Sequence, residues 1–187
     1  NLPLSMGASA VLVPKPQPAE LLEAVRKYRP TMSPLVPTMY IGMLQHPDLA
    51  KTDMTCFKVI TSGGASLPVE VLQQFKDLTG VDINEGFGMT ETSPQTHLNP
   101  IQGRKKPGSI GLPYPDTDVK IVDIETGTKE MPVGEPGEMI FRGPQITKGY
   151  LNRPDETAKS IKDGWLYSGD IAYMDEEGYF YIVDRKK

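Results

Sequence analysis

Two glycine-rich segments contain residue types suited to binding a flat, charged ligand. In the first, Ser62-Gly63-Gly64-Ala65-Ser66, adjacent glycines let the backbone approach a ligand closely because no Cβ intervenes. A helix beginning near Pro68 would direct its N-terminal amides to the same place, which favours an anion. A tight turn between a strand and a helix explains the same residues, so these residues alone leave both interpretations open.

The second segment, Gly86-Phe87-Gly88-Met89-Thr90-Glu91, offers groups for three parts of a nucleotide. Phe87 has a ring face for a base, Thr90 a hydroxyl for a phosphate, and Glu91 a hard oxygen ligand for Mg²⁺. The glycine spacing superficially matches a dinucleotide fingerprint. However, its sixth position is Glu91, and the Thr-Ser-Pro at 92–94 disfavours the helix that such a fingerprint needs. A solvated helix start is the plainer interpretation of Thr90 and Glu91.

Two segments near the end of the sequence offer groups for a ribose. The Asp170 carboxylate follows Gly169 and can accept two hydrogen bonds from a ribose diol. Arg185 can hydrogen-bond a ribose or neutralise a phosphate. A surface turn and a charged chain end are the plainer interpretations, and for Lys186 we favour the charged chain end.

Strand and helix patterns alternate through the first half of the chain. Glycine and proline positions bound each one, Ser66 is the predicted N-cap of the third helix, and Gly80 is its predicted end. The alternation predicts parallel βαβ units, in which the loops after the strands gather at one edge and bind ligands. We therefore expect both glycine-rich segments at that edge. The predicted strands are 8–13, 31–35, 57–61 and 81–84, and the predicted helices are 18–28, 37–45 and 68–78.

From residue 107 onward the pattern becomes β-rich. Alternating stretches at 119–124, 138–142 and 179–183 predict strands separated by glycine-containing turns, and 154–161 predicts one short helix. The predicted fold class is therefore α/β: a parallel βαβ sheet layer in residues 1–106, followed by a smaller β-rich subdomain, an antiparallel sheet or distorted barrel, in residues 107–187.

Composition narrows the classes of function. Of the 187 residues, 24% are charged and 38% hydrophobic, which is ordinary for a globular domain and argues against disorder. The net charge is 20 − 24 = −4, which argues against nucleic-acid binding through a basic surface, and no apolar run is long enough to predict a membrane span. Cys56 is the single cysteine of the sequence, and we expect it in the core. A lone cysteine cannot form an internal disulfide, which predicts a reducing, cytoplasmic compartment. We expect His46 and His97 at the surface.

Five ordered motifs make the whole chain resemble the adenylate-forming acyl-CoA synthetase (AMP-binding) superfamily, with fatty-acyl-CoA synthetases as the nearest members. Gly88-Met89-Thr90-Glu91 is more similar to acyl- and aryl-CoA ligases than to peptide-synthetase adenylation domains. The motifs are Thr61-Ser62-Gly63-Gly64-Ala65-Ser66-Leu67-Pro68, Gly86-Phe87-Gly88-Met89-Thr90-Glu91, Gly143-Pro144-Gln145-Ile146 with Gly149-Tyr150 and Asn152-Arg153-Pro154, Gly164-Trp165-Leu166-Tyr167-Ser168-Gly169-Asp170, and Asp184-Arg185-Lys186-Lys187.

The resemblance implies a reaction and a set of roles. Members join a carboxylic acid to ATP, release pyrophosphate, and transfer the acyl group from acyl-AMP to coenzyme A. Thr90 would bind the α-phosphate, Glu91 would hold Mg²⁺, and these two would be the catalytic residues. Asp170 would bind the ribose hydroxyls, assisted by Arg185. The residues implied to line the adenine are Gly64, Ala65 and Ser66 on one side and Glu85, Gly86, Phe87, Gly88 and Met89 on the other, with Phe87 stacking.

The family's phosphate loop and C-terminal domain have no counterpart in the sequence, and Lys187 falls at the family's interdomain hinge. We therefore expect a piece of a longer ligase that is inactive by itself and that forms homo-oligomers or associates through open strand edges. A medium- or long-chain fatty acid is the favoured substrate, and an aryl acid such as a coumarate is the alternative. Two alternatives come from other functional classes: a dinucleotide-binding module and a non-catalytic interaction domain. Peripheral membrane association is left open.

Overall fold

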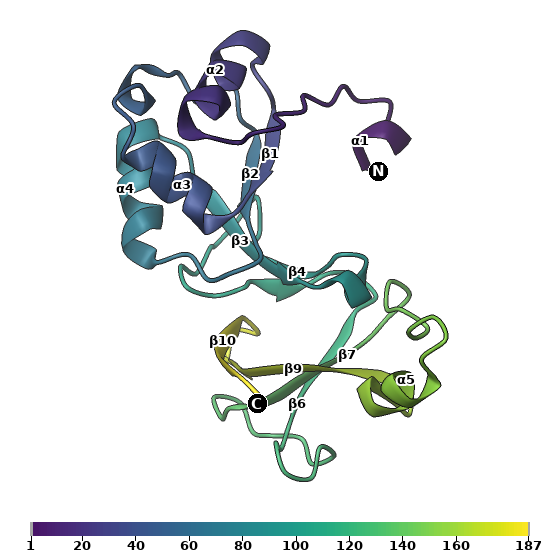
Figure 1. The fold of residues 1–187 in the computed structure, drawn as a ribbon. Coiled ribbons are helices and arrows are strands. Elements are labelled where there is room, and N and C mark those ends of the chain that lie inside the picture. Colours follow the sequence, from purple (N-terminus) through teal and green to yellow (C-terminus); the bar gives the residue numbers. More distant parts are fainter. Residues whose placement is uncertain (1, 187) are drawn as a thin grey trace. The chain divides into compact units, whose positions relative to one another are not determined.

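The computed structural model describes residues 2–186, and the chain forms two compact units that meet in sequence between Ile83 and Asn84 (Figure 1). None of the helices in residues 2–186 combines the length and the apolar character needed to cross a membrane. The elements of the first unit are α1 (Leu2–Ser5), α2 (Pro18–Tyr28), β1 (Met32–Leu35), α3 (Pro37–Leu44), η1 (Leu49–Lys51), β2 (Val59–Ser62) and α4 (Val69–Thr79).

The core of the first unit holds the strand that leads into the first glycine-rich segment. Helices α2, α3 and α4 lie together beside β1 and β2 (Figure 1), and the rings of Tyr40 and Phe75 meet edge to face at 5.3 Å. The Tyr40 hydroxyl donates to the carbonyl of Thr61 at 2.8 Å. Because both rings are fully buried, this bond fixes the end of β2. Helix α4 stops at the predicted glycine: its C-cap is Gly80, which takes a left-handed conformation.

Strands β1 and β2 pair in parallel, from Met32 opposite Val59 to Leu35 opposite Ser62, with α3 in the connection. This pairing confirms the predicted βαβ unit. The predicted strand at 8–13 is wrong, because these residues form an irregular segment in which Val11 and Leu12 are exposed. A high β-propensity produces a strand only where a neighbouring strand supplies hydrogen-bond partners.

The second unit is built from antiparallel strands. Strands β3, β4 and β5 pair in that order, while β6, β7, β9 and β10 form a second sheet in the order β10-β9-β7-β6, with β8 beside β9 and α5 at the start of that hairpin (Figure 1). The elements are β3 (Ile83–Gly88), η2 (Thr90–Thr92), β4 (Gln95–Leu98), β5 (Leu112–Pro113), β6 (Asp118–Val122), β7 (Gly137–Arg142), α5 (Pro154–Ser160), β8 (Ile161–Lys162), β9 (Trp165–Met174) and β10 (Phe180–Arg185).

The two compact units divide at 83/84, and antiparallel pairing begins with β3 and β4. One feature of the second unit differs from the sequence prediction. Strand β9 is ten residues long, so Ser168, Gly169 and Asp170 lie within a strand and not in a turn before it. Glycine and small polar residues hide the strand pattern in this stretch.

His97 is completely buried, so its predicted surface position is wrong. Its ring lies among three phenylalanines, with centroid distances of 4.8 Å to Phe180, 6.0 Å to Phe141 and 6.5 Å to Phe87. Strand β4 is paired on both sides, which directs this side chain into the interior. Burial in apolar surroundings lowers the pKa of His97 to about 3, because it disfavours the charged imidazolium.

The buried histidine predicts a pH dependence of stability. Between the lowered pKa of about 3 and the unfolded pKa of about 6.5, the unfolded chain binds a proton at His97 that the folded chain does not. The free energy of unfolding therefore decreases as the pH is lowered. This residue accounts for a decrease of about 2 kcal/mol from pH 8 to pH 5. Denaturant unfolding of the complete protein at both pH values measures the change.

His97→Phe removes this titration while keeping an aromatic ring among the three phenylalanines. We expect the variant to lose less stability than the unsubstituted protein between pH 8 and pH 5. The control His46→Gln, at a partly buried site in the first unit, should retain the full loss. Equal losses in His97→Phe and in the unsubstituted protein would contradict the prediction.

Candidate functional site

The first glycine-rich segment presents an open backbone surface in its own unit. Gly64 has a φ of +83°, a conformation that favours glycine. A Cβ at Gly63 would meet nothing within 4 Å, and one at Gly64 would lie 3.8 Å from Val36. Gly64, Ala65 and Ser66 are exposed. Packing inside this unit therefore leaves space in front of these three residues, as a ligand-binding backbone requires.

The start of α4 differs from the prediction. Its N-cap residue is Pro68, and no side chain caps the helix, so the predicted cap at Ser66 is wrong. The turn from β2 to α4 has the predicted length but lies one residue later in the sequence. Ser66 is consequently an exposed loop residue next to Ala65.

The glycines of the second segment serve the chain's own packing. Gly86 and Gly88 lie in β3, and a Cβ on Gly88 would come within 1.9 Å of the Pro94 carbonyl oxygen. A Cβ on Gly86 would lie 2.8 Å from the carbonyl oxygen of His97. Neither position therefore accepts a side chain without a backbone shift. Close approach between β3 and the chain around β4 accounts for both glycines without a ligand.

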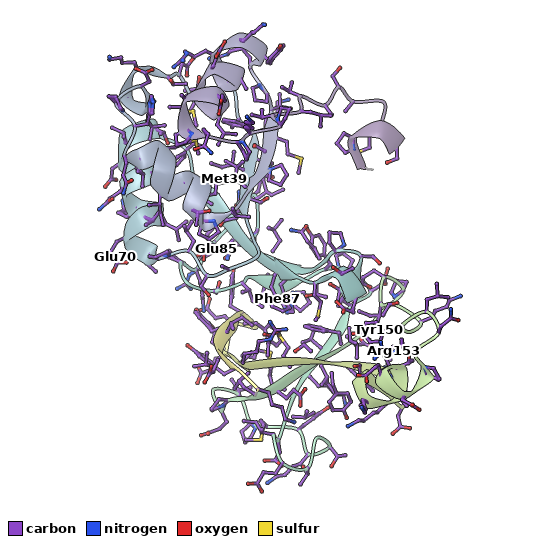
Figure 2. The ribbon with its side chains drawn as sticks, in the orientation of Figure 1. Met39, Glu70, Glu85, Phe87, Tyr150 and Arg153 are labelled. Carbon is purple, nitrogen blue, oxygen red and sulfur yellow. The ribbon has the colours of Figure 1, made fainter. Side chains whose placement is uncertain are left out.

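Phe87 and Glu85 both extend from β3 (Figure 2). The Phe87 ring stacks on Phe141, with centroids 6.0 Å apart, and it packs with Met89 against the core of the second unit. The buried Glu85 carboxylate accepts the backbone N–H of Gly108 at 3.0 Å. One face of Phe87 is thus supported by the core, and Glu85 anchors a neighbouring loop.

Thr90 and Glu91 lie in a 3₁₀ turn, η2. Thr92 closes the turn, since its hydroxyl accepts the N–H of Met89 at 3.0 Å. Thr90 is exposed and Glu91 is partly buried. The Tyr150 hydroxyl donates to Glu91 Oε1 at 2.9 Å, and the N–H of Thr147 donates to the Glu91 carbonyl at 2.8 Å. Glu91 is therefore held from two sides.

Tyr150 was noted only as part of a family motif, and its side-chain contact was not predicted. Burial raises the pKa of Tyr150, and the hydrogen bond to Glu91 raises it further. Tyr150 and Arg153 both lie near α5 (Figure 2). Tyr150 lies 59 positions beyond Glu91 in the sequence. Only folding brings its hydroxyl to the Glu91 carboxylate.

Asp170 and Arg185 are paired directly across β9 and β10. Arg185 Nε lies 3.8 Å from Asp170 Oδ1, and the side chains are 75% and 14% exposed respectively. Burial raises the pKa of Asp170, the positive charge of Arg185 opposes that rise, and the negative charge of Glu138 adds to it. The Ser168 hydroxyl fixes the irregular backbone of β9 here, since it accepts the N–H of Asp170 at 3.0 Å and donates to the Met139 carbonyl at 2.6 Å.

Glu138 and Lys186 were not predicted as site residues. Lys186, which was interpreted as a charged chain end, has a specific partner, because its Nζ donates to Glu138 Oε2 at 2.8 Å. The local sequence pattern gave no sign that Glu138, at the start of the predicted strand 138–142, would be buried. A buried Glu is rare unless it is paired.

A metal ion fits Glu91 in one specific way. Within residues 2–186, no group of three or more His, Cys, Asp or Glu side chains has metal-binding geometry. Mg²⁺ commonly takes only one or two carboxylates from a protein and completes its shell with phosphate and water oxygens. The single anchored carboxylate of Glu91 fits an ion that arrives with a polyphosphate.

Relatives of known function share both sequence and fold with this chain. Over all 187 residues it is 51% identical to the long-chain-fatty-acid–CoA ligase of Bacillus subtilis (strain 168), and it covers 33% of that protein. ATP-bound MatB from Rhodopseudomonas palustris matches 99% of this chain and 36% of its own, with a TM-score of 0.91 and 33% identity.

A third relative is the anthranilate–CoA ligase AuaEII in complex with anthranoyl-AMP. It matches 98% of this chain and 35% of its own, with a TM-score of 0.91 and 30% identity. The chain thus spans about a third of the length of the relatives named here. These matches confirm the predicted α/β fold class.

A family model described as AMP-binding enzyme matches residues 1–151. The match includes both glycine-rich segments and the Gly149-Tyr150 step. The resemblance inferred from the five motifs is confirmed, and the chain belongs to the AMP-binding enzyme family.

Proposed function

We propose that this chain contributes nucleotide-binding residues to an acid–CoA ligase. The complete enzyme would join a carboxylic acid to ATP, release pyrophosphate, and pass the acyl group from acyl-AMP to coenzyme A. The observation that carries the proposal is the mostly buried Asp170 carboxylate, which pairs with Arg185 on the adjacent strand. The chain that holds this pair belongs to the AMP-binding enzyme family. The lone cysteine agrees with a cytoplasmic enzyme.

The reaction that we propose brings two negative groups together. An oxygen of the acid's carboxylate attacks the α-phosphorus of ATP, a new P–O bond forms, and the bond to pyrophosphate breaks. Oriented donors must stabilise the charge on the α-phosphoryl oxygens. The exposed Thr90 hydroxyl supplies one donor, and Glu91 would hold Mg²⁺. When bound, this ion offsets phosphate charge.

The ribose of the nucleotide would bind at Asp170. A carboxylate accepts hydrogen bonds at both oxygens, so one group can receive both ribose hydroxyls. Arg185 keeps positive charge beside it. In the first unit, the exposed backbone at Gly64, Ala65 and Ser66 is proposed for adenine binding. In the second unit, Glu85 to Gly88 in β3 and the following Met89 are proposed for adenine binding.

We propose a medium- or long-chain fatty acid as the substrate, supported by the name of the relative that is 51% identical. An aryl acid is the alternative, because a structural relative at 30% identity is an anthranilate–CoA ligase. A dinucleotide-binding module would need a helix to begin within the glycine-rich segment. Gly86 and Gly88 instead belong to β3, and a three-residue turn follows. A non-catalytic interaction domain is the remaining alternative class.

An acid panel tests the proposal and its alternatives. We expect the complete protein to release AMP with ATP, coenzyme A and saturated fatty acids, with kcat/KM at least about tenfold higher than for coumarate or anthranilate. A coupled assay of AMP release measures this. A preference for the aromatic acids would favour the aryl alternative, and no release with any acid would favour the interaction domain.

Replacing Asp170 tests the ribose assignment. Asp170→Asn keeps the shape but loses the charge and one acceptor, so we expect the KM for ATP to rise about 10- to 100-fold. The KM for the acid should change little. Asp118→Asn, an exposed aspartate on the same sheet, is the control. Unchanged ATP kinetics in Asp170→Asn would remove the assignment.

Replacing Tyr150 tests whether the contact with Glu91 matters for the metal. Tyr150→Phe removes only the hydroxyl that holds Glu91 Oε1, so we expect the Mg²⁺ concentration for half-maximal rate to rise about tenfold. Tyr167→Phe, which removes a hydroxyl bonded to Gly127 O at 2.7 Å, should leave it unchanged. Equal Mg²⁺ dependence in both variants would contradict a role of the Tyr150–Glu91 contact in metal binding.

A further inference from the structure

Glu138 is a buried carboxylate that the proposed reaction does not use. It lies in β7 and is 4% exposed. Its Oε1 accepts the backbone N–H of Gly169 at 3.2 Å, and its Oε2 accepts Lys186 Nζ at 2.8 Å. Lys186 Nζ also donates to the carbonyl of Ile124 at 2.9 Å. Such pairing is required, because an unpartnered buried charge is strongly destabilising.

The two partners of Glu138 lie next to Asp170 and Arg185, the residues proposed to bind the ribose. Gly169 immediately precedes Asp170, and Lys186 immediately follows Arg185. The backbone N–H of Lys186 also donates to the Gly169 carbonyl at 2.7 Å. One carboxylate therefore links Gly169, the residue before Asp170 in β9, with Lys186, the residue that follows the end of β10.

The strands are irregular at this place. The register of β7 against β9 shifts between Glu138 and Ile140, and that of β10 against β9 shifts between Ile182 and Asp184. Gly169 has a φ of +75°. Where a bulge interrupts the ladder, regular hydrogen bonds no longer determine where the next side chain points. Side-chain contacts must supply that constraint.

We propose that Glu138 and Lys186 are positioning residues for ribose recognition, holding Asp170 and Arg185 in the register that lets the carboxylate receive both hydroxyls. This inference rests on the proposed function. Neither residue touches the nucleotide; they act through Gly169 and the backbone of β10. Loss of either contact frees the bulge and lets Asp170 move out of line with the ribose.

Discrimination between ATP and its deoxy analogues separates this role from simple stability. A merely structural residue would lower kcat/KM for ATP, 2′-deoxy-ATP and 3′-deoxy-ATP equally. A positioning residue for Asp170 lowers the preference for ATP over the analogues. The readout is therefore the ratio of kcat/KM values, measured on the complete enzyme together with its melting temperature.

The variants remove the contacts in steps. Glu138→Gln keeps an acceptor for Gly169 N–H and loses the charge facing Lys186. Lys186→Met loses the ion pair and the hydrogen bond to the Ile124 carbonyl. Glu138→Ala loses both contacts of the carboxylate. We expect the preference for ATP to fall about fivefold in the first two and about 20-fold in Glu138→Ala. The KM for the acid should stay within about twofold. Partial retention by Gln relative to Ala is the conservative rescue.

Asp118→Asn and Arg142→Met are matched controls, since they break an ion pair on β6 and β7 whose side chains are 60% and 55% exposed. Both should keep the full preference for ATP. Glu138→Gln should add no further loss to Asp170→Asn, because the two act on one contact. If Glu138→Ala fails to fold, Glu138→Gln and Lys186→Met decide the question.

The outcomes separate two failures. If Asp170→Asn loses the preference for ATP while Glu138→Gln and Lys186→Met retain it, the positioning role is overturned and the proposed function stands. Equal losses for ATP and both analogues in the Glu138 and Lys186 variants also overturn it. If Asp170→Asn itself retains the preference, the ribose assignment fails and the inference falls with it.

Discussion

Burying a carboxylate requires compensation by a cation or by hydrogen-bond donors, and this requirement organises the second unit. Glu138 is compensated by Lys186 and the Gly169 N–H, and Asp170 by Arg185. Each compensation spans separate strands of one sheet. The irregular part of β9 is thereby tied to β7 on one side and β10 on the other, and the geometry of the candidate ribose site depends on these ties.

The glycines of the two candidate motifs have different physical causes. Gly63 and Gly64 have space around them in their own unit, so a ligand-facing backbone is a sufficient reason for their small size. Gly86 and Gly88 have none, because the carbonyl oxygens of His97 and Pro94 occupy the places where a Cβ would lie. A glycine-rich motif thus combines two requirements, close ligand approach and close chain packing, which residue type alone does not separate.

Local patterns predicted the elements of the first unit well and those of the second less well. Periodicity identified α2 and α4, because each buries one face. The same reasoning misplaced 8–13, since strand formation depends on a partner, and missed most of β9, whose Ser168-Gly169 step breaks the pattern. His97 was misjudged because a neutral imidazole surrounded by aromatic rings behaves as an apolar side chain, which no local pattern reveals.

Family motifs name candidate site residues, but not the residues that hold them in place. Glu91 was named for a metal, yet the Tyr150 hydroxyl that fixes its Oε1 comes from 59 positions away. Asp170 was named for a ribose, yet Glu138 holds its strand from 31 positions before Gly169. Binding a mobile nucleotide gains affinity when the receiving groups are ordered beforehand, because less freedom is then lost on association. The long-range contacts of Tyr150 and Glu138 supply that order, and they exist only in the folded chain. Sequence separation conceals them for the same physical reason that makes them effective: each ties together segments that the backbone alone leaves free.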